Sequence, residues 1–161
     1  MTTVSNTSPL LSFAKIDRLD LLEQLCRSIF IPKAVHDEVM VRPDRPDAQA
    51  IARAKWIQVM PINDRRAVRQ LLRKDLDLGE SEAIVLAREV NADRLLLDDL
   101  AARRIASRRT IPVVGSLGLL LLAKTNQLIP AVKPLLSDMI DAGRYVDPEI
   151  FNEILTLAGE N

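Results

Sequence analysis

The sequence predicts an α/β fold built on a central, mainly parallel β-sheet of about four to five strands. Short apolar runs alternate along the chain with longer segments whose apolar residues recur at helical spacing, and this alternation is typical of strands joined by crossover helices. The chain has 161 residues, of which 48% are hydrophobic, which is enough for the core of one globular domain. No apolar stretch is long enough to cross a membrane, and the first residues lack a signal-peptide pattern, so we expect a cytoplasmic protein that does not contact membranes.

Five segments have the character of strands. Ser28–Ile31 has the pattern of a strand and stops at Pro32, a residue that cannot donate a hydrogen bond to a sheet. Leu95–Leu97 is a continuous apolar run, as expected for a strand buried on both faces. The predicted strands are residues 2–5, 28–31, 56–60, 95–97 and 111–114.

Helices are predicted between these strands and after them. Ser8 and Pro9 have the pattern of an N-cap followed by proline at the first helical position. Gly79 precedes a clear helix, Ser116 is placed to cap another, and Gly143 is a stop signal near the C-terminus. The predicted helices lie on either side of Asp17 and Arg18, from residue 34 onward, and at residues 48–55, 80–91, 101–109, 117–126, 128–142 and 148–157.

Composition limits the chemistry that this chain can perform. Cys26 is the only cysteine, which excludes an internal disulfide and a cysteine zinc site and suits a reducing cytoplasm. His36 is the only histidine, so the two-imidazole acid–base pair of metal-free ribonucleases is excluded. The 22 basic and 22 acidic residues cancel, so the net charge does not indicate a nucleic-acid partner. Abundant carboxylates favour chemistry on a hard metal ion with oxygen ligands.

Polar residues follow two of the predicted strands. Asp98 and Asp99 come directly after Leu95–Leu97, and Asn6 follows the first strand. In open parallel sheets, ligands bind beyond the carboxyl ends of the strands. Each aspartate either serves such a site or caps the helix that starts near Leu100. Asn6 either ligates a metal through its carbonyl oxygen or holds a turn.

Two glutamates are predicted to project from the apolar faces of their helices. Glu80 lies three and four residues before Ala83 and Ile84, so it shares their face at the N-terminal end of the helix. Glu38 is similarly aligned with the apolar residues that precede it in its own helix. Glu82 falls about 200° further round the helix than Glu80, so we expect it to meet water. For Glu80, the alternative role is a negative charge that stabilises a helix N-terminus.

These acids and the amide are predicted to converge at the carboxyl edge of one sheet. Carboxylates packed together repel each other strongly, and a divalent cation relieves that repulsion. An oxygen-only ligand set suits Mg²⁺ or Mn²⁺. Such an ion activates a water molecule and stabilises charge on a phosphodiester without any histidine. The candidate residues are Asn6, Glu38, Glu80, Asp98 and Asp99.

Several sequence segments resemble those of the PIN-domain nucleases, especially a prokaryotic, VapC-like subgroup. The resemblance extends from residue 4 to about residue 129, and each segment alone is weak, but their order and spacing are fairly specific. The segments are residues 4–10 (VSNTSPL), 31–39 (IPKAVHDEV), 78–87 (LGESEAIVLA), 95–99 (LLLDD) and 115–118 (GSLG).

This resemblance implies a PIN-like, three-layer α/β/α domain that cleaves RNA with Mg²⁺ or Mn²⁺ held by a few acids. Residues 1–130 are then the catalytic domain, and residues 131–161 are a C-terminal helical extension packed on it. Glu38 resembles the second-motif acid, Glu80 the third, and Asp98 or Asp99 the fourth. Such proteins commonly form homodimers and commonly act as toxins neutralised by a small antitoxin protein.

Asn6 is the main departure from the pattern, because the family usually has an aspartate there. The amide keeps an oxygen ligand but loses a negative charge. Two hypotheses therefore remain open: an active metal-dependent ribonuclease with Glu38, Glu80 and Asp98 as metal ligands, or a catalytically weakened PIN-like module that binds RNA or protein.

Candidate substrate-binding residues are Thr7, Ser8, Ser116 and Arg103. Arg103 belongs to one of two local basic clusters, at residues 65–74 and 103–109, which either contact phosphates or form ordinary solvated helix faces. Aromatic residues make up 3% of the chain, so base stacking would depend on few rings and strong sequence readout of a single strand is not expected.

Overall fold

The computed structural model describes residues 1–161 and contains one sheet of five strands, all parallel, which confirms the predicted α/β fold. The strand order is β3-β2-β1-β4-β5, with β1 in the centre. The chain therefore builds outward from β1 on one side, then crosses over to add β4 and β5 on the other. The strands are β1 (Thr3–Ser5), β2 (Ile29–Ile31), β3 (Ile57–Val59), β4 (Arg94–Leu96) and β5 (Val113–Val114).

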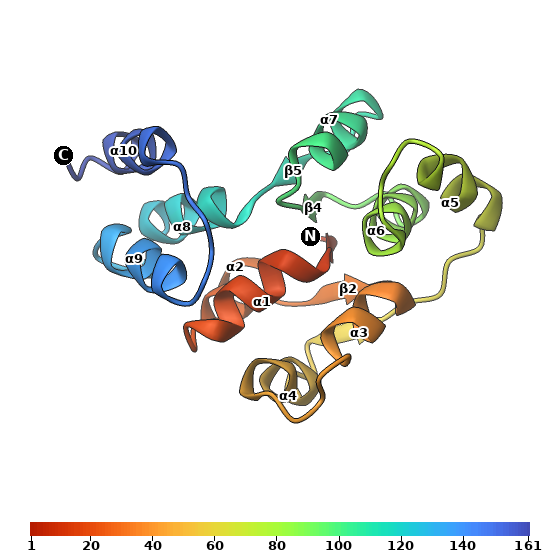
Figure 1. The fold of residues 1–161 in the computed structure, drawn as a ribbon, viewed down its shortest axis with the longest axis horizontal. Coiled ribbons are helices and arrows are strands. Elements are labelled where there is room, and N and C mark those ends of the chain that lie inside the picture. The colour runs from red at the N-terminus through yellow and green to blue at the C-terminus, as the bar shows by residue number, and fades with distance from the viewer.

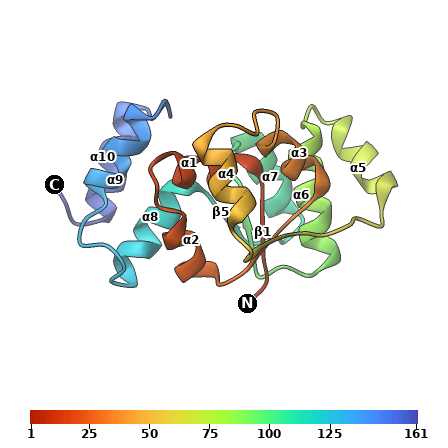
Figure 2. The same cartoon turned by 90° about the horizontal axis from the view of Figure 1, so that it is seen from below.

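Ten helices surround the sheet and complete three layers (Figures 1 and 2). The C-terminal helices and α5 lie at opposite ends of the long axis in both views. No helix is long and apolar enough to cross a membrane. The helices are α1 (Thr7–Lys15), α2 (Leu19–Cys26), α3 (Lys33–Val39), α4 (Pro46–Arg53), α5 (Arg65–Leu72), α6 (Leu78–Glu89), α7 (Leu100–Arg108), α8 (Ser116–Thr125), α9 (Lys133–Asp141) and α10 (Pro148–Leu157).

The strand β4 separates two hydrophobic cores. Leu96 packs into a core shared with α1, α2, α8 and α9, whereas Leu95 and Leu97 pack into a core shared with α5, α6 and α7. Alternate side chains of a strand point to opposite faces, so both faces of the sheet are covered. The helices that follow β1 and β4, α1 and α7, lie on opposite faces. A crevice is expected at the carboxyl ends of these two strands, because the strand order reverses there.

Several helices start one or two residues earlier than predicted. Asn6, rather than Ser8, is the N-cap of α1, and the Ser8 hydroxyl bonds to Asp98 at 3.0 Å instead. Gly115, rather than Ser116, is the N-cap of α8, and the Ser116 hydroxyl bonds to Asp98 instead. Gly79 lies inside α6, which Asp77 caps.

The prediction that Glu82 meets water is wrong. Its side chain is only 5% exposed, and it accepts hydrogen bonds from the Ala34 N–H at 3.0 Å and from Arg65 Nη2 at 2.8 Å. Residues 81–87 are all buried, because α6 packs against both α3 and α5. Glu82 therefore links the start of α3 to α5. This structural contact engages Arg65, which belongs to the basic cluster at residues 65–74.

The C-terminal segment is held to α9 by Glu160. The Glu160 carboxylate accepts hydrogen bonds from the Val132 N–H at 2.7 Å, the Lys133 N–H at 3.0 Å and Lys124 Nζ at 2.9 Å. Val132 and Lys133 begin α9, which starts later than predicted. Although burial raises the pKa of Glu160, these hydrogen bonds lower it to about 2. Both ends of the segment that contains α9 and α10 are therefore fixed.

We expect Glu160→Gln to lower the free energy of unfolding at pH 7 by about 1 kcal/mol, or the melting temperature by about 2–4 °C. The pKa of Glu160 is lower in the folded than in the unfolded protein, where it is about 4.3. Its contribution is therefore present above pH ~4.3 and lost as the pH falls toward 2. Thermal melts of both proteins from pH 7 to pH 2.5 measure this, and a melting-temperature difference that is unchanged over this range would contradict it.

Candidate active site

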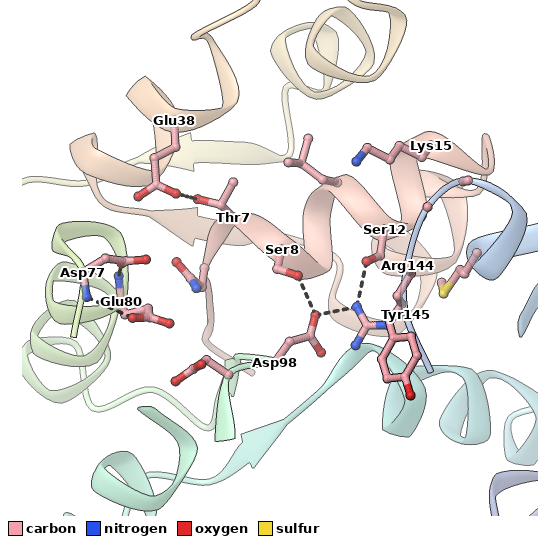
Figure 3. A pocket seen from close by; sticks show the side chains of 16 residues that line it. Thr7, Ser8, Ser12, Lys15, Glu38, Asp77, Glu80, Asp98, Arg144 and Tyr145 are labelled. Atoms are coloured by element: carbon pink, nitrogen blue, oxygen red, sulfur yellow. Dashed lines mark hydrogen bonds and ion pairs between the residues drawn. The ribbon is translucent and has the colours of Figure 1, made fainter. Parts of the chain in front are cut away.

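A pocket of about 550 Å³ lies where the strand order reverses, at the carboxyl ends of β1 and β4 (Figure 3). Asn6, Glu38, Glu80, Asp98 and Asp99 all line it, so the structure brings together every predicted metal-site residue from segments far apart in the sequence. Further lining side chains include Thr7, Ser8, Ser12, Lys15, Asp77, Arg144 and Tyr145.

The two sides of the pocket differ in charge. Figure 3 shows Glu38, Asp77 and Glu80 on one side, and Lys15 and Arg144 on the other. Five carboxylates face two cationic side chains around the pocket, so negative charge is in excess. An RNA phosphate would be repelled here unless a further cation offset that excess.

Glu38 is fixed by the residues on either side of it. Thr7 Oγ1 donates a hydrogen bond to Glu38 Oε2 at 2.7 Å, and Oε1 lies so close to Gly79 that a Cβ there would overlap it. Burial is the main cause that raises the pKa of Glu38; the Asp77 carboxylate also raises it, and the Thr7 hydrogen bond acts against them. The glycine at the start of α6 is therefore needed for Glu38 to enter the pocket.

Glu80 combines both roles that the sequence left open. Glu80 Oε1 accepts the Asp77 N–H at 3.0 Å while the Asp77 carboxylate accepts the Glu80 N–H at 2.7 Å, which is a capping box at the start of α6. Burial raises the pKa of Glu80 most, and the carboxylates of Asp77, Asp99 and Glu38 add to that rise. Several negative charges thus lie near Glu80, and a bound cation would reduce the repulsion between them.

Asp98 is the most heavily hydrogen-bonded acid in the pocket. Its Oδ1 accepts the Ser116 N–H at 2.7 Å. Its Oδ2 accepts Ser116 Oγ at 2.7 Å, Ser8 Oγ at 3.0 Å and Arg144 Nη1 at 3.1 Å. Burial raises the pKa of Asp98, but the charge of Arg144 and the hydrogen bonds lower it overall. Asp98 therefore already has the partners of an ionised carboxylate.

Asp99 is exposed, and its Oδ2 caps α7 by accepting the Ala102 N–H at 2.9 Å. Capping of the helix near Leu100 is the structural alternative that the sequence left open for both aspartates, and Asp99 is the one that caps it. No hydrogen bond engages its Oδ1, and its carboxylate is close enough to Glu80 to raise the pKa of that residue. Asp99 is therefore freer than Asp98 to accept a new partner.

Asn6 contributes a buried oxygen without a partner. The residue is 7% exposed, and its Oδ1 makes no hydrogen bond. A buried acceptor left unpaired costs about 1–3 kcal/mol, and a bound ion or water molecule at such an atom would remove that cost. An amide oxygen is also a ligand that Mg²⁺ and Mn²⁺ accept.

The four predicted substrate-binding residues are placed differently. Thr7 and Ser8 line the pocket, where the Thr7 hydroxyl donates to Glu38 and the Ser8 hydroxyl donates to Asp98. Ser116 is fully buried behind Asp98. The Arg103 guanidinium lies against Gly115, where an added Cβ would be 2.6 Å from its Nη1 and 3.1 Å from Asp98 Oδ1. Ser116 and Arg103 thus surround Asp98 from outside the pocket.

Sequence reasoning missed Arg144, which enters the pocket from the loop between α9 and α10. Its Nη1 donates to Ser12 Oγ at 3.0 Å and to Asp98 Oδ2 at 3.1 Å. Ser12 and Lys15, also missed, lie on the α1 surface that continues from Ser8. Only the stop signal at Gly143 pointed to a turn in this region, and nothing in the sequence indicated where the turn would lie.

Fold and site together define a class: a parallel α/β domain with an acidic, oxygen-rich pocket at its topological switch point. A family model described as a PIN domain matches residues 2–160. The chain belongs to the PIN-domain family, which confirms the predicted family and three-layer fold. PIN domains have a nuclease-type fold and generally use divalent metal ions. No curated protein matches the chain.

Proposed function

We propose that this protein is an endoribonuclease that depends on Mg²⁺ or Mn²⁺ and hydrolyses phosphodiester bonds of RNA. The observation that carries the proposal is that oxygen-bearing side chains converge on one pocket, namely Asn6, Glu38, Glu80 and Asp99. Beside them, Asp98 accepts a hydrogen bond from Arg144. We also propose that the substrate is RNA, that the protein acts as a toxin neutralised by a small antitoxin protein, and that it forms a homodimer. These three parts of the proposal rest on the PIN resemblance alone.

The donor chemistry of the pocket fits a hard divalent cation. Carboxylate and amide oxygens are the ligands that Mg²⁺ and Mn²⁺ prefer. No three acidic, histidine or cysteine side chains are close enough to hold one ion as they stand. Glu38, Glu80 and Asp99 would therefore have to move closer together to hold an ion, and Asn6 Oδ1, which has no hydrogen-bond partner, would be a further oxygen ligand. When bound, such a cation activates water and stabilises charge on a phosphodiester.

The side chains of the pocket have distinct tasks in this proposal. Thr7 orients Glu38, and the capping box orients Glu80. Asp98 positions Arg144 through an ion pair at 3.1 Å. Arg144 and Lys15 supply the positive charge that faces an RNA phosphate from the side opposite the acids. We therefore assign Asp98 to positioning, although the sequence had suggested it as a metal ligand.

The test is cleavage of a labelled RNA by the pure protein. We expect cleavage with Mn²⁺ or Mg²⁺, no cleavage after EDTA treatment, and recovery when the metal is added back in excess. Cleavage that is equally fast in EDTA would contradict the metal dependence. An absence of cleavage with either metal would contradict the enzymatic proposal.

One observation favours the alternative of a catalytically weakened module that binds RNA or protein. Asn6 has no charge, and the charge of Asp98 is already matched by Arg144, so fewer negative charges are available for a metal than in the usual family pattern. The Asn6→Asp variant separates the two functions. Cleavage by the natural protein supports the enzyme, whereas RNA binding without cleavage, combined with cleavage by Asn6→Asp, supports the module.

A further inference from the structure

One of the five aromatic rings of the chain is placed unlike the others. Phe13 is fully buried, and Phe30, Trp56 and Phe151 are partly buried against the two hydrophobic cores. Tyr145 is 83% exposed. It belongs to neither hydrophobic core, and exposing such a large ring is unfavourable.

Tyr145 stands at the wall of the acidic pocket, on the same side as Arg144 (Figure 3). The backbone there is well fixed: the Gly143 N–H bonds to the Ile140 carbonyl at 3.0 Å, and the Arg144 N–H bonds to the Met139 carbonyl at 3.0 Å. Gly143 has a φ of 110°, which glycine adopts without strain, and it lines the pocket together with Arg144 and Tyr145.

Arg144 fixes the position of this loop against α1 and β4. Its guanidinium bonds to Ser12 in α1 and to Asp98 after β4, and its side chain is only 22% exposed. Tyr145, which follows Arg144 in the chain, therefore has a defined backbone position, although its own side chain is exposed to solvent. Nucleic-acid bases stack on exposed aromatic side chains that border a groove containing positive charge, and Tyr145 lines the pocket beside Arg144.

We propose that Tyr145 stacks on an unpaired base of the RNA strand whose phosphate lies in the pocket, and that this ring supplies part of the affinity for that strand. This inference rests on the proposed function. Bases inside an A-form duplex are stacked on one another and offer no free face, whereas bases in single strands and loops do. Stacking is tolerant of base identity, because every base has a π-face. The contact with Tyr145 therefore requires an unpaired base but does not depend on which base it is.

The test compares binding of a short single-stranded RNA and of the same strand in a duplex, by fluorescence anisotropy with Ca²⁺ in place of Mn²⁺. We expect Tyr145→Leu to weaken single-strand binding about 5- to 50-fold, as loss of one base–aromatic contact predicts. Tyr145→Phe keeps the ring and is expected to stay within about 2-fold of the natural protein. Duplex binding should be equal in all three. Leu157→Ser changes an exposed residue of α10 outside the pocket and is the matched control.

Single-strand binding by Tyr145→Leu that equals that of the natural protein would overturn the inference. The same holds if Tyr145→Phe is as weak as Tyr145→Leu, or if duplex binding falls equally. If the natural protein cleaves RNA but any of these contradicting results is obtained, the inference about Tyr145 fails while the proposed function stands. If the natural protein neither binds nor cleaves RNA, both fail.

Discussion

Replacing Glu80 by glutamine is expected to reduce the rate of RNA cleavage by about 100-fold or more, because losing even an indirect contact to a metal ligand costs 10- to 100-fold. Glu80 has carboxylates on several sides, which raise its pKa together with burial. A cation bound there gains from the negative charge of Glu80, and glutamine removes that charge. The measurement is single-turnover cleavage of labelled RNA in Mn²⁺.

Glutamine suits this test because it preserves the fold. Its amide oxygen can still accept the Asp77 N–H, so the capping box of α6 remains. Glu23→Gln is the control, since Glu23 is an exposed acid of α2 whose side chain makes no hydrogen bond. Equal thermal stability of the two variants shows that α6 is intact, and cleavage by Glu80→Gln at the natural rate would refute the role of Glu80.

Replacing Asp98 by alanine is expected to lower the free energy of unfolding by about 2–4 kcal/mol, close to the range for breaking a buried ion pair. The Asp98 side chain is 11% exposed and that of Arg144 is 22% exposed, so the guanidinium would keep its charge without its counter-charge. The Ser116 N–H and hydroxyl would also lose their acceptor. Urea unfolding at pH 7 measures the change.

A double-mutant cycle with Arg144→Ala isolates the ion pair. We expect the double variant to be less destabilised than the sum of the two single variants, because the unpaired charge is then absent. The pKa of Asp98 is lowered on folding, so the contribution of Asp98 is present above its unfolded pKa of about 3.9 and is lost as the pH falls below it. Additive effects at pH 7 would show that the pair contributes little.

The fold was largely predictable because its strands and helices have clear apolar periods. Leu95–Leu97 reads as a strand buried on both faces, and its residues do pack into two different cores. Strand-end polar residues and helix faces then led to the acids of the pocket. These inferences need only local periodicity and the rule that parallel strands end at one edge.

The rest of the site depends on packing between distant segments, which periodicity does not contain. Arg144 reaches Asp98 only because α9 packs against α1 and α8, and no local pattern encodes that contact. Glu82 was misjudged for a related reason: α6 is covered on several sides, so the side opposite its main apolar face is also buried. A polar residue there is matched by Ala34 and Arg65, far away in the sequence.

The close approach of Glu38 to Gly79 makes these two positions a single evolutionary unit. Any side chain at position 79 would occupy the space of Glu38 Oε1, so the glycine cannot drift while the glutamate is under selection. Conversely, once the acid is lost, the glycine has no remaining steric reason to persist, and alanine is the better helix former. The pair therefore records, in the sequence of any descendant of this protein, whether the pocket has been kept in use.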